Sequence, residues 1–351
     1  MKPLSKPNRA MTLPVLLEHR MSFEGTLLLR RSDVEQLLSL RECIDAVEKV
    51  FRLQGEGKIL PPGILGIKAK GGGFHVKAGL LSGEKDFLVA KLNTNFPGNP
   101  TRAGLPTIQG VIVICDANNG CPLALLDSID ITIKRTAAAT AVAARHLARK
   151  NSTVATICGC GAQGFAQLRA IQLVRPLKKV YAFDLDEGAA KIFADELSHD
   201  LKVDIKPVKE VSSAIRKSDL IVTCTPSREF FISKQDISPG TFIAAVGADD
   251  SHKQEIDPAL MASAKVVADS LDQACSIGDT HHAIAKHLMS KTDVHAELSE
   301  IVAGQKPGRT SDAEIIIFDS TGIAIEDAIA AAAVYEKART SGVGTYFKFA
   351  A

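Results

Sequence analysis

Residues 153–170 read TVATICGCGAQGFAQLRA and contain the most informative motif of the chain. A run of small and β-branched residues leads into Gly159, Gly161 and Gly164, which are spaced as G-x-G-x-x-G. In a strand–turn–helix unit the first glycine permits a tight turn, the second lets the backbone approach a pyrophosphate, and the third lets helix and strand pack closely. The helix that follows offers free N–H groups and a partial positive charge at its start. The stretch therefore predicts a dinucleotide-binding loop.

An acidic residue at the end of the next apolar run supports this interpretation. Residues 179–186 read KVYAFDLD and place Asp184 20 positions after Gly164. A carboxylate there accepts hydrogen bonds from the ribose hydroxyls of the adenosine and repels a 2′-phosphate. We therefore expect NAD, used as NAD or NADH, rather than NADP. The alternative is a glycine-rich turn in an unrelated α/β protein.

The rest of the chain divides at about residue 150. Beyond it, short apolar runs alternate with helical segments, which is typical of a parallel, doubly wound sheet. These runs are residues 154–158, 180–183, 205–208, 220–224, 241–246, 266–268 and 315–318. Before it, two helices, one opening at Ser32 and one through 43–53, precede strand-like runs at 64–70, 74–78, 87–93, 107–115 and 122–126. Further helices are predicted at 131–150 and 322–338. The prediction is an α/β protein with a Rossmann sheet and a second, α+β unit containing an antiparallel sheet.

Composition narrows the class of protein. A chain of 351 residues is long enough for two domains, and a formal charge of +2 gives no case for binding nucleic acid or an acidic membrane surface. No apolar run is long enough for a transmembrane helix. The seven cysteines are scattered, so we expect a reduced cytoplasmic protein without disulfides.

Three local features receive a plain interpretation. Residues 1–24 are basic and irregular, and we expect a disordered extension or a true start at Met11 or Met21; an organelle transit segment is the alternative. The Cys158–Cys160 pair has no second ligand pair nearby, and His281–His282 has no carboxylate at helical ligand spacing. We therefore expect no metal site.

Several blocks, taken together, resemble one family. They are AKLNTNFPGNPTRAGLPTIQG (90–110), IKRTAAATAVAARHLARK (133–150), CGCGAQGFAQL (158–168), AAVGADDSHKQEID (244–257) and IFDSTGIAIEDAIAAAAVYEKA (317–338). The chain resembles the ornithine cyclodeaminase and mu-crystallin family, which includes archaeal alanine dehydrogenase, from about Leu27 to the C-terminus. The resemblance implies a homodimer and a discontinuous substrate and dimerisation domain, residues 25–150 with 322–351, around an NAD domain at 151–321.

The resemblance also implies roles for individual residues. Lys91 matches the active-site lysine, Arg135 an arginine that holds the substrate carboxylate, and Asp249 the proton acceptor or water activator, for which Asp250 is a rival. A guanidinium binds a carboxylate with two hydrogen bonds, and a developing iminium needs a nearby carboxylate. Together with the glycine motif, the resemblance predicts these cofactor contacts: Thr107, Arg135, Thr136, Gly159, Gly161, Ala162, Gln163, Gly164, Asp184, Thr225, Val246, Gly247, Asp249, Ser320 and Thr321.

The chain also departs from its family. Relatives carry an arginine after the Pro-Pro turn, where this chain has Gly63, and the next strand offers His75 and Lys77 instead. We expect Lys77, with His75, to bind the substrate, either replacing that arginine or reading a second carboxylate; Lys77 resembles a lysine of the family's iminosuccinate reductases. The alternative is that Lys77 points to solvent.

Three functions follow from these residues. The first is an NAD-dependent dehydrogenase or imine reductase acting on a small amino or imino acid, such as alanine, a cyclic ketimine or iminosuccinate. The second is a cyclodeaminase that converts ornithine to proline and ammonia with catalytic NAD, which the absence of an acid for the distal amine disfavours. The third is a ligand-binding protein like mu-crystallin, which the presence of Lys91, Arg135 and Asp249 disfavours.

Overall fold

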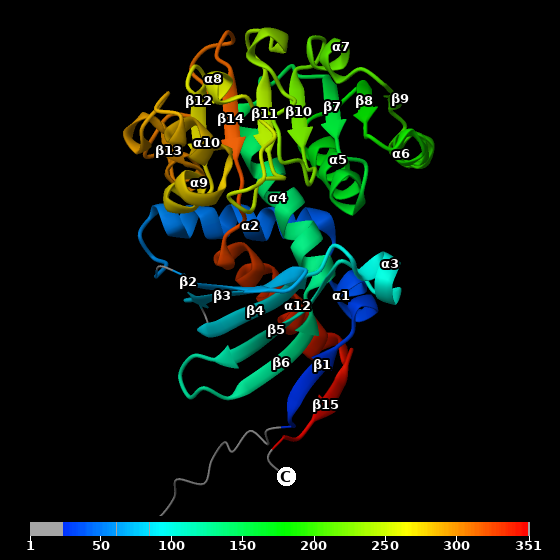
Figure 1. Ribbon diagram of the computed structural model, residues 1–351. Helices are drawn as coiled ribbons and strands as arrows, with labels where there is room; N and C mark the ends of the chain where they lie inside the picture. Colours follow the sequence, from blue (N-terminus) through cyan, green and yellow to red (C-terminus); the bar gives the residue numbers. More distant parts are fainter. Residues whose placement is uncertain (1–23, 61, 84, 350–351) are drawn as a thin grey trace, which may run out of the picture.

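The computed structural model describes residues 24–60, 62–83 and 85–349. The expectation for the N-terminal extension therefore lies, apart from Glu24, outside the described residues. Two sheets lie one above the other in Figure 1, with helices between them and around the upper one.

The upper sheet has eight parallel strands in the order β13-β12-β14-β11-β10-β7-β8-β9. The strand order reverses between β7 and β10, and such a switch point at the carboxyl ends of strands is where ligands bind in doubly wound sheets. Its strands are β7 (Val154–Cys158), β8 (Lys179–Phe183), β9 (Asp204–Pro207), β10 (Leu220–Thr223), β11 (Phe242–Ala245), β12 (Lys265–Ala268), β13 (Ala296–Glu297) and β14 (Ile316–Asp319). The helices among them are α5 (Ala162–Val174), α6 (Glu187–Leu201), α7 (Val211–Ile215), α8 (Pro258–Met261), α9 (Leu271–Ile277), α10 (Asp279–Ala285) and α11 (Leu298–Val302).

The lower sheet has seven strands in the order β15-β1-β6-β5-β4-β3-β2. Neighbouring strands are antiparallel except β1 and β6, which are parallel. The strands are β1 (Thr26–Leu29), β2 (Gly63–Ala69), β3 (Gly72–Leu81), β4 (Phe87–Asn95), β5 (Ile108–Asp116), β6 (Pro122–Asp127) and β15 (Thr345–Phe347). Sequence reasoning missed β1 and β15, because each is short and β15 pairs with a segment at the other end of the chain.

Five helices accompany this sheet, and their ends correct the predicted bounds. They are α1 (Arg31–Leu37), α2 (Leu40–Gly55), α3 (Asn99–Ala103), α4 (Ile129–Leu147) and α12 (Ala324–Ser341). The predicted start of α1 at Ser32 is wrong, because Asp33 accepts a hydrogen bond from the backbone N–H of Arg30 and makes Arg30 the N-cap. Helix α4 ends before residue 150 because Arg175 donates to the carbonyls of Ala144 and Ala148.

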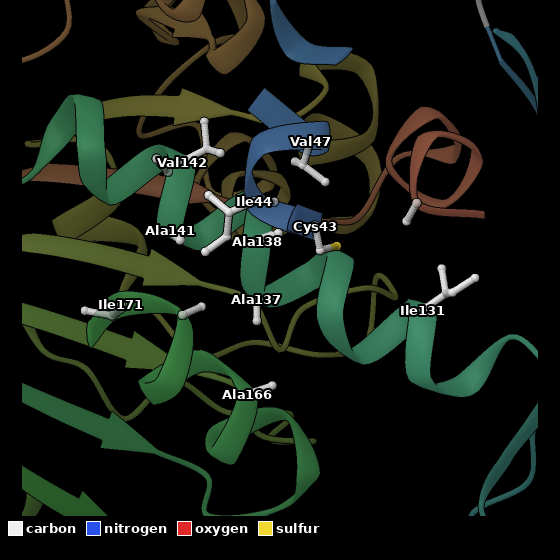
Figure 2. Packing of buried hydrophobic residues seen from close by; sticks show 14 of the residues in the cluster. Cys43, Ile44, Val47, Ile131, Ala137, Ala138, Ala141, Val142, Ala166 and Ile171 are labelled. Atoms are coloured by element: carbon white, nitrogen blue, oxygen red, sulfur yellow. The ribbon is translucent and has the colours of Figure 1, made fainter. Parts of the chain in front are cut away.

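The core lies where α4 passes from one sheet to the other. Ala137, Ala138 and Ala141 are fully buried on α4, and their small side chains let α2 and α5 approach the helix closely. Figure 2 shows Ile44 of α2 and Ile171 of α5 in this packing. Helix α4 therefore carries Arg135, near its N-terminal end, in a rigid frame between the two sheets.

Candidate active site

The loop after β7 has the geometry of a pyrophosphate cradle. Gly159 has φ +98°, a left-handed conformation that a side chain would strain. A Cβ on Gly164 would lie 2.1 Å from the carbonyl oxygen of Gly159, whereas Gly161 faces open space. Helix α5 begins at Ala162 without a side-chain cap, so its first N–H groups, including those of Ala162 and Gln163, are free to bind an anion. These residues fit a dinucleotide.

Asp184 is oriented by the same loop. Its Oδ2 accepts a hydrogen bond from the N–H of Cys160 at 2.8 Å, and its Oδ1 accepts from the N–H of Asp186 at 3.0 Å. Each carboxylate oxygen keeps a lone pair for a ribose hydroxyl. The position therefore suits the unphosphorylated ribose of NAD.

A buried glutamate that sequence reasoning missed holds the loops at the switch point. Glu255 accepts hydrogen bonds from the N–H and Oγ1 of Thr225, both at 2.7 Å, and from the N–H of Gly247 at 2.8 Å. Burial raises the pKa of Glu255, and these bonds act in the opposite direction. Three predicted contacts, Thr225, Val246 and Gly247, thus lie on two loops tied together at the carboxyl ends of β10 and β11. Glu255 lies in the block of residues 244–257 that carries part of the family resemblance, and this position was the sequence signal that could have identified it.

Lys91 and Arg135 are brought together by two acidic residues of α12, which sequence reasoning also missed. The Lys91 Nζ lies 2.6 Å from Oδ2 of Asp327, and Arg135 Nε lies 2.9 Å from Oδ1 of the same carboxylate. Arg135 Nη1 also donates to Glu326 at 2.8 Å. All four side chains are buried. Asp327 therefore bridges the two cations that were predicted to hold a substrate carboxylate.

Burial sets the protonation of this cluster. It lowers the pKa of Lys91 to about 7, although the Asp327 carboxylate acts against it. It raises the pKa of Glu326 to about 7. Burial also raises the pKa of Asp327, but the charges of Arg135 and Lys91 outweigh that and hold it below its ordinary value. Burial and the Asp327 carboxylate therefore act in opposite directions on the charge of Lys91.

Lys77 lies beside this cluster and does not point to solvent. It stands opposite Lys91 in the pairing of β3 with β4. Its Nζ donates to the carbonyl of Gly322 at 2.5 Å and approaches that of Thr321 at 3.4 Å. Burial lowers its pKa. His75 lies two residues along the same face of β3 and is exposed.

The segment from β14 to α12 crosses between the two sheets at this point. Gly322 has φ +75°, and a Cβ there would lie 2.3 Å from Nη1 of Arg135. The hydroxyl of Ser320 is buried and has no partner among the described residues. Thr321 is bound by Asp269, a further buried acid that sequence reasoning missed. The predicted contacts Ser320 and Thr321 thus lie next to the cations.

The remaining predicted residues differ in their exposure and contacts. Asp249, after β11, is 54% exposed and forms an ion pair with Lys253 at 2.5 Å. Its charge opposes the lowering of the Lys77 pKa by burial. Asp250 accepts a hydrogen bond from the N–H of His252. Thr136 is buried beside Arg135, and Thr107 is half-buried just before β5.

The described residues contain no group of three or more His, Cys, Asp or Glu side chains placed to hold a metal ion. All seven cysteines are free thiols. Within the same part of the chain no helix combines the length and the hydropathy needed to cross a membrane.

A doubly wound parallel sheet with this glycine loop after β7 is the arrangement of a dinucleotide-binding protein. The family model of the ornithine cyclodeaminase/mu-crystallin family matches residues 24–342, and the chain belongs to that family.

Three relatives illustrate the similarity. The chain is 39% identical over 325 residues, 92% of this chain and 98% of the relative, to the alanine dehydrogenase of Archaeoglobus fulgidus. The structure of Thermococcus litoralis Δ1-pyrroline-2-carboxylate reductase with NADH and L-proline is 37% identical, with a TM-score of 0.87 over 92% of this chain and 100% of the other. The iminosuccinate reductase of Paracoccus denitrificans with NAD⁺ is 31% identical, with a TM-score of 0.84 over 92% and 98%.

These comparisons confirm four expectations from the sequence. The chain has the expected α/β Rossmann fold, belongs to the expected family, uses NAD and is an oxidoreductase of small amino or imino acids.

Proposed function

We propose that the protein uses NADH to reduce the C=N bond of a small α-imino acid to the L-amino acid, and catalyses the reverse oxidation. The observation that carries this proposal is the convergence of Lys77, Lys91 and Arg135 beneath the carboxyl edge of the parallel sheet. A carboxylate bound there holds the substrate with its Cα near the predicted position of the nicotinamide.

Each residue has a defined task in this reaction. Arg135 and Lys91 bind and orient the substrate carboxylate, and Arg135 does so with a planar fork of donors. NADH supplies the hydride to Cα, and NAD accepts it in the reverse direction. In the oxidation the Asp249 carboxylate accepts the proton that the amine nitrogen loses, and in the reduction the protonated carboxyl returns a proton to that nitrogen. In this structure Asp249 forms an ion pair with Lys253.

The other two functions have weaker support. A cyclodeaminase must hold the distal amine of ornithine, and β3, the strand that carries Lys77, contains no acidic residue. A carrier protein needs no groups that orient a substrate carboxylate, yet Asp327 holds Lys91 and Arg135 side by side. We therefore place both behind the reductase.

An assay of NADH consumption tests the proposal. We expect stoichiometric NADH oxidation with at least one of pyruvate plus ammonia, Δ1-pyrroline-2-carboxylate and iminosuccinate. Lys77→Met tests whether Lys77 binds a second carboxylate of the substrate. If it does, the substitution should lower the turnover of iminosuccinate more than the turnover of the monocarboxylates. Ammonia release from ornithine without net NADH change would instead establish the cyclodeaminase, and inertness with all substrates would leave the carrier.

We further propose that each sheet belongs to one domain, the lower sheet to residues 25–150 with 322–351 and the upper sheet to residues 151–321.

We also propose that the protein is a homodimer and that the lower sheet forms the dimer interface. Its outer face carries an apolar row across four strands: Leu65, Val76, Leu92 and Val111 are paired in register. Of these, Leu65 is 54%, Leu92 36% and Val111 37% exposed. An apolar face of this kind marks an interaction site. A solved archaeal alanine dehydrogenase, 39% identical, is described as a dimer. We also propose a cytoplasmic location, and the free thiols support this proposal.

The substitution Leu92→Glu should dissociate this dimer. A two-fold axis introduces the charge twice, and an unpaired buried charge costs several kcal/mol, so dissociation should increase by about 100-fold or more. Light scattering after gel filtration measures the mass. Ile192→Glu on α6, at a position 56% exposed, is the matched control and should leave the mass unchanged. An unchanged mass for Leu92→Glu would place the interface elsewhere.

A further inference from the structure

We propose that Asp269 is a positioning residue, which acts through the Thr321–Gly322 peptide to hold Lys77 and Arg135 in place for the substrate carboxylate. The role in substrate binding rests on the function proposed above. Asp269 follows β12 of the parallel sheet, whereas Lys77 belongs to the antiparallel sheet. The contact between them runs through the segment that crosses from β14 to α12.

Asp269 is fully buried, and both its oxygens bind backbone. Its Oδ2 accepts from the N–H of Thr321 at 2.7 Å and from that of Gly322 at 2.5 Å. Its Oδ1 accepts from Oγ1 of Thr321 at 2.9 Å and from the N–H of Ser270 at 2.7 Å. These donors satisfy the hydrogen-bonding capacity of the carboxylate without a cation in direct contact. Three of the four hydrogen bonds come from the segment that crosses from β14 to α12, so Asp269 fixes the position of that segment.

The crossing segment transmits this orientation to Lys77. In a trans peptide the N–H and the C=O point in opposite directions. The peptide that donates the Gly322 N–H to Asp269 therefore turns the Thr321 carbonyl the other way, toward Lys77 Nζ at 3.4 Å. The next carbonyl, of Gly322, accepts from the same Nζ at 2.5 Å. Asp269 and Lys77 thus form hydrogen bonds to opposite sides of the same turn.

The same turn positions Arg135. Gly322 packs so tightly on the guanidinium that a Cβ would lie 2.3 Å from Nη1. If the turn shifted, it would either collide with Arg135 or release it from Glu326, which lies four residues further on. Asp269 therefore controls two of the three cations without touching either.

The charges around Lys77 determine what the loss of Asp269 does. Lys77 is faced by Arg135 of α4, by Lys91 of β4, by Asp327 of α12, by Asp249 of the loop after β11, and by Asp269. Burial and Arg135 lower the pKa of Lys77, whereas the three carboxylates raise it. Removing the charge of Asp269 should therefore lower that pKa further, and Lys77 should lose its proton at lower pH.

The test compares Asp269→Asn with wild type. We expect kcat/KM to fall by about 100-fold, the loss typical of a small misplacement of binding groups. Competitive labelling of lysines with acetic anhydride, read by mass spectrometry across pH, reports the titration of Lys77 without turnover. Its midpoint should move to lower pH in Asp269→Asn. In the Lys77→Met background, Asp269→Asn should cost clearly less than in wild type, because the two residues act in one unit.

Two further variants keep the test decisive. Asp236 is another buried carboxylate, paired with Arg216 far from the crossing segment, so Asp236→Asn should leave kcat/KM and the Lys77 titration unchanged. Thr321→Val removes one hydrogen bond to Asp269 without changing charge, and should lower kcat/KM by less than Asp269→Asn does. It serves as the test variant if Asp269→Asn fails to fold. An unmoved Lys77 midpoint, or additive losses in the double variant, would overturn the inference. Failure of the wild type to oxidise NADH would instead refute the proposed reaction.

Discussion

Replacing Arg135 by lysine should lower kcat/KM for the imino acid by about 100-fold. Lysine keeps the positive charge but loses the planar fork, and it cannot reach Glu326 and Asp327 together with the substrate. Charge-assisted hydrogen bonds contribute about 1.5–3 kcal/mol each, and about 2.7 kcal/mol corresponds to two orders of magnitude in rate. Steady-state kinetics with the best substrate of the panel measures the effect, which should appear mainly in KM.

Arg145 provides the matched control on the same helix. It also forms an ion pair with a carboxylate, that of Glu48, but lies ten residues further along α4. Arg145→Lys should leave kcat/KM within about twofold, since exposed and half-exposed pairs contribute little. Thermal unfolding of both variants separates a loss of binding from a loss of fold. Equal kinetics for Arg135→Lys and wild type would remove Arg135 from the substrate site.

The second large effect concerns the choice of cofactor. Asp184→Ser should shift the ratio of kcat/KM for NADPH over NADH by about 100-fold toward NADPH. The substitution removes an acceptor for the ribose hydroxyls and, at the same time, the charge that repels a 2′-phosphate. Each loss is expected to be of the order of 1.5 kcal/mol, and together they make about two orders of magnitude. Initial rates with each cofactor at saturating imino acid measure the ratio.

Asp186, two residues further on, is the control for this experiment. Its side chain caps α6 by accepting from the N–H groups of Gly188 and Ala189. Asp186→Ser keeps a capping hydroxyl, and should leave the preference for NADH unchanged. If both variants changed the ratio alike, the selectivity would be a property of the loop rather than of the Asp184 carboxylate.

The parts of the site that could be predicted from the sequence are those that depend on local geometry. The pyrophosphate-binding loop could be predicted from Gly159, Gly161 and Gly164, because the conformations and contacts that these glycines require lie within one strand–turn–helix unit. The roles of Lys91, Arg135 and Asp249 came only from the family resemblance, because a lysine in a strand or an arginine in a helix has no local signature. Whether Lys77 reached into the site or into solvent stayed open for the same reason.

The acidic partners could not be predicted, because they depend on which elements meet. Asp327 and Glu326 stand in an Ala-rich helix, where acids in the first turn are ordinary features of a helix start. Only the packing of α12 against α4 and β4 buries them beside Arg135 and Lys91. Asp269 and Glu255 likewise follow from loops that converge at the carboxyl edge of the sheet.

Short-range periodicity and glycine conformations were enough to predict the parallel sheet, the dinucleotide loop and the acidic residue expected to favour NAD. The tertiary structure alone decided how the three cations are paired and where Lys77 points. The physical reason is burial: charged groups removed from water must find partners, and the partners come from elements far apart in the chain.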